Sequence, residues 1–145
     1  MGMYRHILAA IELDDNGPPV LQRAQALAKL FGSELSVVHV VEYVPIESGD
    51  ALVAAPVNLM QELTGQAEQK LLALCQGNGV AQTSARILCG PVAGEILNFV
   101  REKGVDLVVV GHHPRRGLLA LFSHTEEDVV ARAHCDLLTL NLPKI

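Results

Sequence analysis

The chain has 145 residues, a length typical of one domain, so we expect residues 1–145 to form a single domain. Half of the residues are hydrophobic and 19% are charged, which excludes a disordered chain and a coiled coil. The formal net charge of -5, the aromatic content of 3% and the absence of Trp argue against nucleic acids and anionic membranes as partners.

The cysteines and the N-terminal residues bear on location. Cys75, Cys89 and Cys135 are an odd number of widely spaced cysteines, which fits neither a disulfide framework nor a Cys-x-x-Cys motif. Residues 1–10 lack the apolar stretch of a signal peptide, and no apolar run is long enough to cross a membrane. We therefore expect a cytoplasmic protein in a reducing compartment.

The first half of the chain predicts two strands and two helices. Residues 6–13 are an apolar run that predicts the first strand, and an apolar stripe over residues 20–31 predicts a helix that ends at Gly32. Residues 35–41 predict the second strand, and residues 59–75 predict a second helix, closed by Gly77 and Gly79. The long connection between them, residues 42–57, is either a tolerated insertion or a lid-like loop with a role in ligand binding.

The second half continues the alternation. Residues 84–89 predict the third strand, and a stripe over residues 96–100 predicts a short third helix that ends at Gly104. Residues 106–110 predict the fourth strand. Thr125 and Asp128 resemble a capping box and predict a fourth helix, and residues 136–142 predict the fifth strand.

This alternation of strands and helices predicts an α/β fold. Right-handed crossovers would place the five strands in one doubly wound, Rossmann-like parallel sheet, with four helices on its two faces. The strands predicted at residues 6–13, 35–41 and 106–110 are almost continuously apolar, so we expect them at the centre of the sheet, covered on both faces.

The candidate site follows from the fold class. In doubly wound sheets, ligands bind beyond the carboxyl ends of the strands where the strand order reverses, here after the first and fourth strands. The first loop reads Glu12-Leu13-Asp14-Asp15-Asn16-Gly17, and its carboxylates could hold Mg²⁺, but the run through Pro18-Pro19 is also typical of an ordinary turn into a helix, which we favour. Neither Gly-x-Ser-x-Gly nor a Gly-x-Gly-x-x-Gly after the first strand occurs, so we expect no enzyme activity.

Histidines offer a further alternative. His112, His113 and His124 could meet and bind a transition metal, with His134 and Cys135 later in the chain. Their spacing matches no zinc-finger or catalytic pattern, so we favour hydrogen bonds to loop backbone for the pair and a helix-capping role for His134. His39, in a central strand, we interpret as a core imidazole with a hydrogen-bond partner. We expect no metal and no cofactor.

Four segments together resemble the universal stress protein family over almost the whole chain. They are HILAAIEL at residues 6–13, SVVHVVE at 36–42, CGPVAGEIL at 89–97 and DLVVVGHHPRRGL at 106–118. The Gly-His-His after the fourth strand is similar to members of the A type, which lack the full ATP-binding glycine motif. The resemblance implies the strand order 3-2-1-4-5, a cytoplasmic homodimer, and a family divided into members that bind ATP and members that do not.

The resemblance also identifies where ATP-binding members hold the nucleotide. They carry Gly-x2-Gly-x9-Gly-Ser/Thr after the fourth strand and an Asp at the end of the first. Here Gly111 matches the first glycine, but Pro114 and His124 stand at the next two, Thr125 keeps the hydroxyl, and Glu12 replaces the Asp. If this chain bound nucleotide in the family's manner, the positions involved would be Ala10, Ile11, Glu12, Val40, Val110, Gly111, Pro114, His124 and Thr125.

These departures weaken a phosphate cradle for physical reasons. Pro114 has no N–H to donate, and a side chain at a left-handed position such as His124 is strained. Glu126, Glu127 and Asp128 would occupy the start of the fourth helix and repel a phosphate there. Together these changes cost about 3–5 kcal/mol, or about two to four orders of magnitude in affinity.

The last strand is the predicted interaction surface. Its residues would end the sheet with an almost uncharged edge, which natural proteins cover or pair: Leu137, Leu138, Thr139, Leu140, Asn141 and Leu142. Antiparallel self-pairing would form the two-fold dimer that the resemblance implies. Two hypotheses follow: a non-enzymatic stress-response homodimer that acts on protein partners, or an adenine-nucleotide sensor or slow ATPase.

Overall fold

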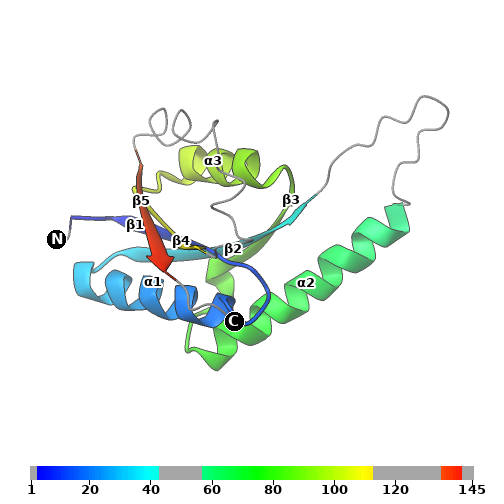
Figure 1. Cartoon of the computed structure of the whole chain (residues 1–145), viewed down its shortest axis with the longest axis horizontal. Coiled ribbons are helices and arrows are strands. Elements are labelled where there is room, and N and C mark those ends of the chain that lie inside the picture. The colour runs from blue at the N-terminus through cyan, green and yellow to red at the C-terminus, as the bar shows by residue number, and fades with distance from the viewer. Residues whose placement is uncertain (1–2, 43–56, 113–134, 142–145) are drawn as a thin grey trace.

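The computed structural model describes residues 3–42, 57–112 and 135–141 (Figure 1). Strands and helices alternate along this part of the chain. In order they are β1 (His6–Ala10), α1 (Gly17–Phe31), β2 (Glu34–Glu42), α2 (Val57–Gly77), a short 3-10 helix (Gln82–Ser84), β3 (Ala85–Gly90), α3 (Val92–Lys103), β4 (Leu107–His112) and β5 (Asp136–Asn141).

The strands form one five-stranded sheet in the order β3-β2-β1-β4-β5, and every neighbouring pair is parallel. The predicted α/β class, the parallel sheet and the strand order are therefore confirmed. The predicted central strands are β1, β2 and β4, and each of them has neighbours on both sides. The described residues contain three α-helices, and the fourth predicted helix, near residues 125–133, lies outside them.

Glycines end two helices as predicted. Gly32 after α1 and Gly104 after α3 both adopt a left-handed conformation with φ of 66°, and their N–H groups donate to Ala28 and Val100. A residue with a Cβ would be strained there, which is why glycine is favoured at both helix ends. α1 begins with prolines in its first turn, where their missing N–H groups cost no intrahelical bond.

The largest error in the predicted strand boundaries is at the end of β1. β1 ends at Ala10, so residues 11–13 are not part of the strand. Ile11 still donates its N–H to the carbonyl of Val38 at 3.0 Å, and its side chain is 2% exposed. Its apolar character therefore reflects burial rather than strand structure. Similarly, Ser84 belongs to the short 3-10 helix and not to β3. The connection at residues 43–56 and Leu142 lie outside the described residues.

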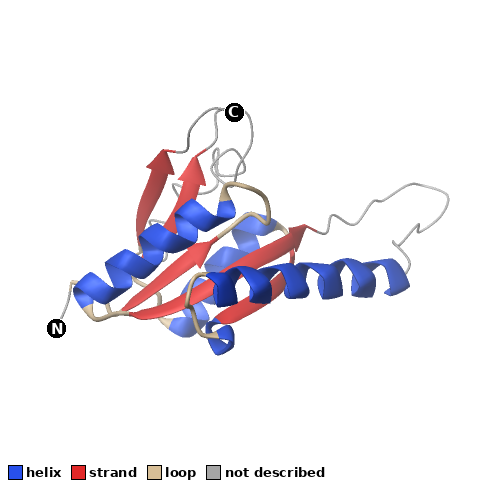
Figure 2. Cartoon of the chain, turned by 90° about the horizontal axis from the view of Figure 1, so that it is seen from below, coloured by secondary structure: helices blue, strands red, loops and turns tan. Residues whose placement is uncertain are grey.

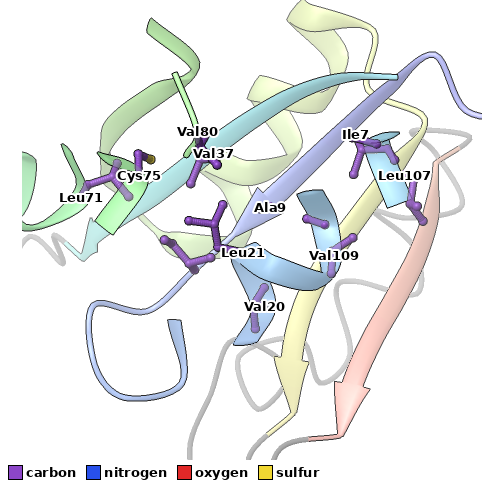
Figure 3. Close-up of a cluster of buried hydrophobic side chains, with 13 residues drawn as sticks. Ile7, Ala9, Val20, Leu21, Val37, Leu71, Cys75, Val80, Leu107 and Val109 are labelled. Atoms are coloured by element: carbon purple, nitrogen blue, oxygen red, sulfur yellow. The ribbon is translucent and has the colours of Figure 1, made fainter. Parts of the chain in front are cut away.

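Two hydrophobic clusters lie on opposite faces of the sheet. On one face, Ile7, Ala9 and Val37 pack against Leu21 of α1 and Leu71 of α2 (Figure 3). On the other face, residues of alternate register pack against α3. The second cluster consists of Leu8, Ala10, Val38, Val40, Val92, Ile96, Phe99, Val100, Val105, Val108, Val110 and Cys135. Because side chains alternate along each strand, every central strand contributes residues to the hydrophobic clusters on both faces of the sheet.

Helix α2 extends beyond the sheet, as Figures 1 and 2 show. One stripe of small and apolar residues runs along it at a spacing of four. Cys75 and Leu71 are 0% and 1% exposed and Ala67 is 8% exposed, but Leu63 and Leu59 are 41% and 45% exposed. The second half of α2 therefore packs into the core, whereas Leu59 and Leu63 in its first half are exposed. None of the described helices is long and apolar enough to cross a membrane.

Polar side chains tie the amino ends of the strands together. The carboxylate of Asp106, just before β4, accepts the N–H groups of Arg5 and His6 at 2.9 and 3.0 Å. The hydroxyl of Tyr4 donates to Asp136 of β5 at 2.9 Å. This hydrogen bond to a carboxylate raises the pKa of Tyr4, and burial raises it further by a smaller amount. Residues from the beginning and the end of the chain therefore meet at one end of the sheet.

Candidate functional site

The candidate site lies where β1 and β4 part. Their ladder ends with the pair Ala9 and Val109. Beyond it, β1 stays with β2, whereas β4 continues beside β5 as far as His112 and Asn141. Figure 3 shows the yellow and red arrows of β4 and β5 pointing away from the blue β1. The sheet therefore opens at its carboxyl end between the two strands that sequence analysis selected.

The structure brings together part of the predicted nucleotide-binding set. Ala10, Ile11 and Val110 are at most 2% exposed, and Val40 is 8% exposed. A ligand at this opening could therefore contact little of these residues except their backbone atoms and small apolar surfaces. Glu12 and Gly111, at the loops themselves, are half-buried. Ala10, Val40 and Val110 share the α3 face, and Ile11 lies on the opposite face. Pro114, His124 and Thr125 lie outside the described residues.

The turn after β1 is built from its own polar groups. The carboxylate of Asp14 accepts the N–H of Asn16 at 2.9 Å, and the carbonyl of Asp14 accepts the N–H of Gly17 at 3.1 Å. A Cβ on Gly17 would lie 2.5 Å from the carbonyl oxygen of Glu12, so only glycine fits this close approach. The prediction of an ordinary turn into a helix is confirmed.

This turn also limits what the N-terminus of α1 can bind. A helix N-terminus holds an anion through free N–H groups. Here the N–H groups of Asn16 and Gly17 already donate to Asp14, and Pro18 and Pro19 have none. The start of α1 is therefore a poor phosphate cradle.

His39 supports the end of β1 from the neighbouring strand. Its Nδ1 lies 2.8 Å from the carbonyl oxygen of Ile11. Because a carbonyl oxygen only accepts, Nδ1 carries the proton and donates. The prediction that His39 has a hydrogen-bond partner is confirmed, although its side chain is half-buried and not part of the deep core. Sequence reasoning missed its position beside the candidate site, because it joins residues far apart in the chain.

The Gly-Pro-x3-Glu segment after β3 also has a structural explanation. Gly90 has φ of 140°, a conformation that residues with side chains rarely adopt. A Cβ there would lie 2.6 Å from a carboxylate oxygen of Glu95, in the first turn of α3. Gly90 therefore permits Glu95 to fold back over the strand end. Together with Glu42 at the end of β2 and Asp14 and Asp15 after β1, this makes the carboxyl end rich in carboxylates.

Of the histidines and the cysteine considered for transition-metal binding, the structure describes only His112 and Cys135. His112 ends β4, at the carboxyl end of the sheet, whereas Cys135 immediately precedes β5, at the amino end. These two residues therefore do not share a site. His113, His124 and His134 lie outside the described residues. Among residues that the structure describes, no group of three His, Cys, Asp or Glu side chains could hold a metal ion.

Known proteins match the chain closely enough to identify its relatives. A sequence model described as the Universal stress protein family matches residues 3–141. The "Universal stress protein A homolog 1" of Coxiella burnetii is 33% identical over 138 residues, which is 94% of this chain and 96% of that protein.

Solved structures share the fold. The universal stress protein UspA from Lactobacillus plantarum superposes with a TM-score of 0.72 at 19% identity, covering 94% of this chain and 97% of that one. The universal stress protein from Archaeoglobus fulgidus, solved in complex with dAMP, has a TM-score of 0.52 at 20% identity, covering 94% and 98%. At these identities the likeness shows the fold alone.

Proposed function

The chain belongs to the universal stress protein family, and on this premise we propose that it is a non-enzymatic, cytoplasmic stress-response protein that acts as a homodimer through protein contacts. We further propose that it does not bind ATP in the manner that the family's glycine motif supports. The two parts of this proposal rest on different ends of the molecule and have separate tests.

The observation that carries the proposal is the edge formed by β5. It is the last strand in the sheet order, and within the described residues it pairs with β4 alone. The N–H of Asp136 donates to the carbonyl of Asp106, so alternate residues along β5 bond to β4. Leu137, Thr139 and Asn141 consequently direct their N–H and C=O groups outward. An uncharged edge of this kind favours pairing with a second copy of the same strand.

The dimer is tested by removing one outward-facing donor. In Thr139→Pro the proline lacks an N–H on the open side only, so the bonds that Leu138 and Leu140 make to β4 remain. Thr139→Ala is the matched control, because it removes the side chain but keeps the N–H. Leu140→Lys is a less specific test, since Leu140 also packs against the core.

Light scattering at micromolar concentration should give about twice the chain mass for the wild type and the alanine variant. The proline variant should dissociate with a Kd raised about tenfold or more. A monomeric wild type would refute the dimer. A proline variant that associates as tightly as the alanine variant would refute this interface.

The start of α1 supports the proposal on ATP. Its first N–H groups are engaged or missing, and carboxylates of Glu42 and Asp14 lie at neighbouring strand ends. A triphosphate brought to this end would meet like charge and few donors. In the loop after β4, Pro114 and His124 replace two glycines of the motif. A thermal-shift titration with Mg-ATP tests this: a saturable rise at millimolar concentration or below would reject it.

A second candidate is an adenine nucleotide with a single phosphate. Two observations favour it: the opening between β1 and β4, and relatives of the same fold solved in complex with dAMP and with cAMP. Such a ligand needs fewer phosphate contacts than ATP. Calorimetric titration with AMP and with Mg-ATP separates the candidates. Binding of AMP alone would support this second function, and binding of neither supports the first.

A further inference from the structure

Strand β2 extends past the beginning of β3. The register pairs Val37 with Ala85, the first residue of β3, so residues 34–36 lie beside β1 on one side but have no partner in β3 on the other. The chain before β3 forms the short 3-10 helix, where the N–H of Ser84 donates to the carbonyl of Ala81 at 3.0 Å. The sheet therefore has a gap beside the first residues of β2.

The backbone of Leu35 faces this gap. The N–H of Glu34 donates to the carbonyl of Arg5, just before β1, at 2.9 Å. Farther along β2, the carbonyl of Val38 accepts the N–H of Ile11, just after β1, at 3.0 Å. Backbone groups of neighbouring residues in a strand point to opposite sides, so Leu35 directs its N–H and its carbonyl away from β1. Neither group has a ladder partner in β3.

A cavity of about 460 Å³, the β2 groove, lies along the gap. Its lining comes from the end of α1, from residues 34–36 and from the connection between α2 and β3. Ser36 and Glu34 turn their side chains toward His6: the hydroxyl oxygen of Ser36 lies 2.7 Å from Nε2, and the carboxylate of Glu34 lies 3.8 Å from Nδ1. Leu35 packs on the opposite face, against the cluster under α1 and α2. What β2 presents to the groove is therefore its backbone and the side chain of Leu35.

The walls of the β2 groove suit a short peptide in an extended conformation. Ala28 and Val80, 7% and 8% exposed, form apolar walls that accommodate a small apolar side chain. The half-buried polar side chains of Gln25 and Ser84 can bond to peptide groups. Lys29, exposed in the last turn of α1, attracts a carboxylate. The volume lies within the range of about 300–1,000 Å³ that is typical of ligand pockets.

We propose that the β2 groove binds an extended segment of a partner protein that carries an acidic residue. The segment adds to the sheet beside residues 34–36, in line with β3, and an N–H of its backbone donates to the carbonyl of Leu35. Its carboxylate lies near Lys29. Binding of this kind rests on the proposed function, in which the protein acts through protein contacts. β5 is at the opposite edge of the sheet from β3, so the groove stays open in the proposed dimer.

The test starts from a phage-displayed library of random octapeptides, selected on the immobilised full chain. Enriched sequences are synthesised with a fluorescein label, and their binding is measured by fluorescence anisotropy. We expect the enriched peptides to contain Asp or Glu and to lack Pro at their centre, since Pro has no N–H to donate. A selection that enriches no peptide would refute the proposal.

Pairing through the backbone is tested by an N-methyl group placed on one peptide residue at a time. Because the N–H groups of neighbouring residues in a strand point to opposite sides, methylation of one central residue should weaken binding about tenfold or more. Methylation of either of its neighbours should have little effect. Equal effects at neighbouring residues would mean that the peptide does not bind as an added strand.

The position of the peptide is tested by filling the groove. Ala81→Trp places a large side chain there, since Ala81 is an exposed lining residue, and it should weaken binding about tenfold or more. Gln82→Trp is the matched control, because Gln82 is also exposed but does not line the groove, and it should bind like the wild type. Lys29→Glu should weaken binding of the acidic peptides about fivefold. Equal binding by Ala81→Trp and the wild type would place the peptide elsewhere and overturn the proposal.

Light scattering on the same samples separates this proposal from the proposed dimer. A dimer that selects no peptide refutes the groove and leaves the dimer standing, whereas a monomer that binds the peptides does the reverse. Assembly beyond a dimer that Ala81→Trp abolishes would assign the groove to a second copy of the chain, against a separate partner protein.

Discussion

The two ends of the sheet are built in opposite ways. At the amino end, Asp106 binds the backbone at the start of β1, and Tyr4 binds Asp136 of β5, so polar side chains close the end across several strands. At the carboxyl end the ladder between β1 and β4 stops at Ala9 and Val109, and the strands separate. Side-chain hydrogen bonds between strands thus mark the end at which the strands stay together, and the candidate site lies at the end where they separate.

Thiol reactivity should show the largest contrast between the ends. The pKa of Cys135, at the amino end, is raised from 9.0 to about 11. Burial is the main cause, and the nearby carboxylates of Asp106 and Asp136 add to it. Its reactive thiolate at neutral pH is therefore roughly a hundredfold scarcer than in an ordinary thiol. Cys89, at the carboxyl end of β3, is exposed.

A thiol reagent at neutral pH should modify Cys89 about 100-fold faster than Cys135, with Cys75 in the core also slow, since burial raises its pKa. Time-resolved mass spectrometry of the peptides measures the three rates separately. Cys89→Ser should abolish the fast phase alone. Equal rates for Cys89 and Cys135 in the folded protein would mean that the amino end is not closed.

Removing the carboxylate that holds the amino end should cost more stability than removing its counterpart at the carboxyl end. Asp106→Ala loses two bonds from backbone N–H groups, which we expect to lower the free energy of unfolding by about 2–4 kcal/mol. Asp14→Ala loses one side-chain bond in an exposed turn and should cost about 0.5–1.5 kcal/mol. Urea unfolding measures both. Equal losses would contradict the comparison.

The smallest effect should come from Tyr4, whose bond to Asp136 is solvent-exposed. Tyr4→Phe should cost about 0.5–1 kcal/mol at neutral pH. The hydrogen bond raises the pKa of Tyr4 above its ordinary value of 10.0. Its contribution is therefore fully present below that pH and is lost as pH rises through the folded pKa.

Unfolding measured at about pH 8 and about pH 11 should show wild type and variant converging at the higher pH. The ring of Phe would keep the edge contact with Phe31, so the variant isolates the hydroxyl. If the difference in the free energy of unfolding between wild type and Tyr4→Phe grew as the pH rose, this interpretation would be wrong.

Most of the fold could be predicted because its signals are local. The apolar runs identified all five strands, and glycines such as Gly32 and Gly104 marked helix ends, since a left-handed residue ends a helix wherever it occurs. The end of β1 was predicted wrongly at residues 11–13, because Ile11 is buried without continuing the strand. The hydrophobicity of a residue indicates whether it is buried. The end of a strand depends instead on where the neighbouring strand moves away from it, and the sequence does not show this.

The position of the opening between β1 and β4 was predictable, but the side-chain contacts around it were not. The rule that ligands bind where strand order reverses located the opening between β1 and β4 correctly in space. The bond from His39 to the Ile11 carbonyl and the pair of His6 and Ser36 could not be inferred, because each joins residues from different strands. Such contacts depend on register, which composition and periodicity do not determine.

The closure of the amino end also has a consequence for the order of folding. Tyr4 and Asp136 are 132 positions apart, and β1 lies between β2, the next strand in the chain, and β4, which follows β3. During synthesis from the N-terminus, β1, β2 and β3 can pair while β1 still presents an unpaired side. β4 covers that side later, and β5 completes the sheet last. The nascent chain therefore exposes the unpaired side of β1, a strand whose five residues are all buried in the folded protein, until residues 107–109 have left the ribosome.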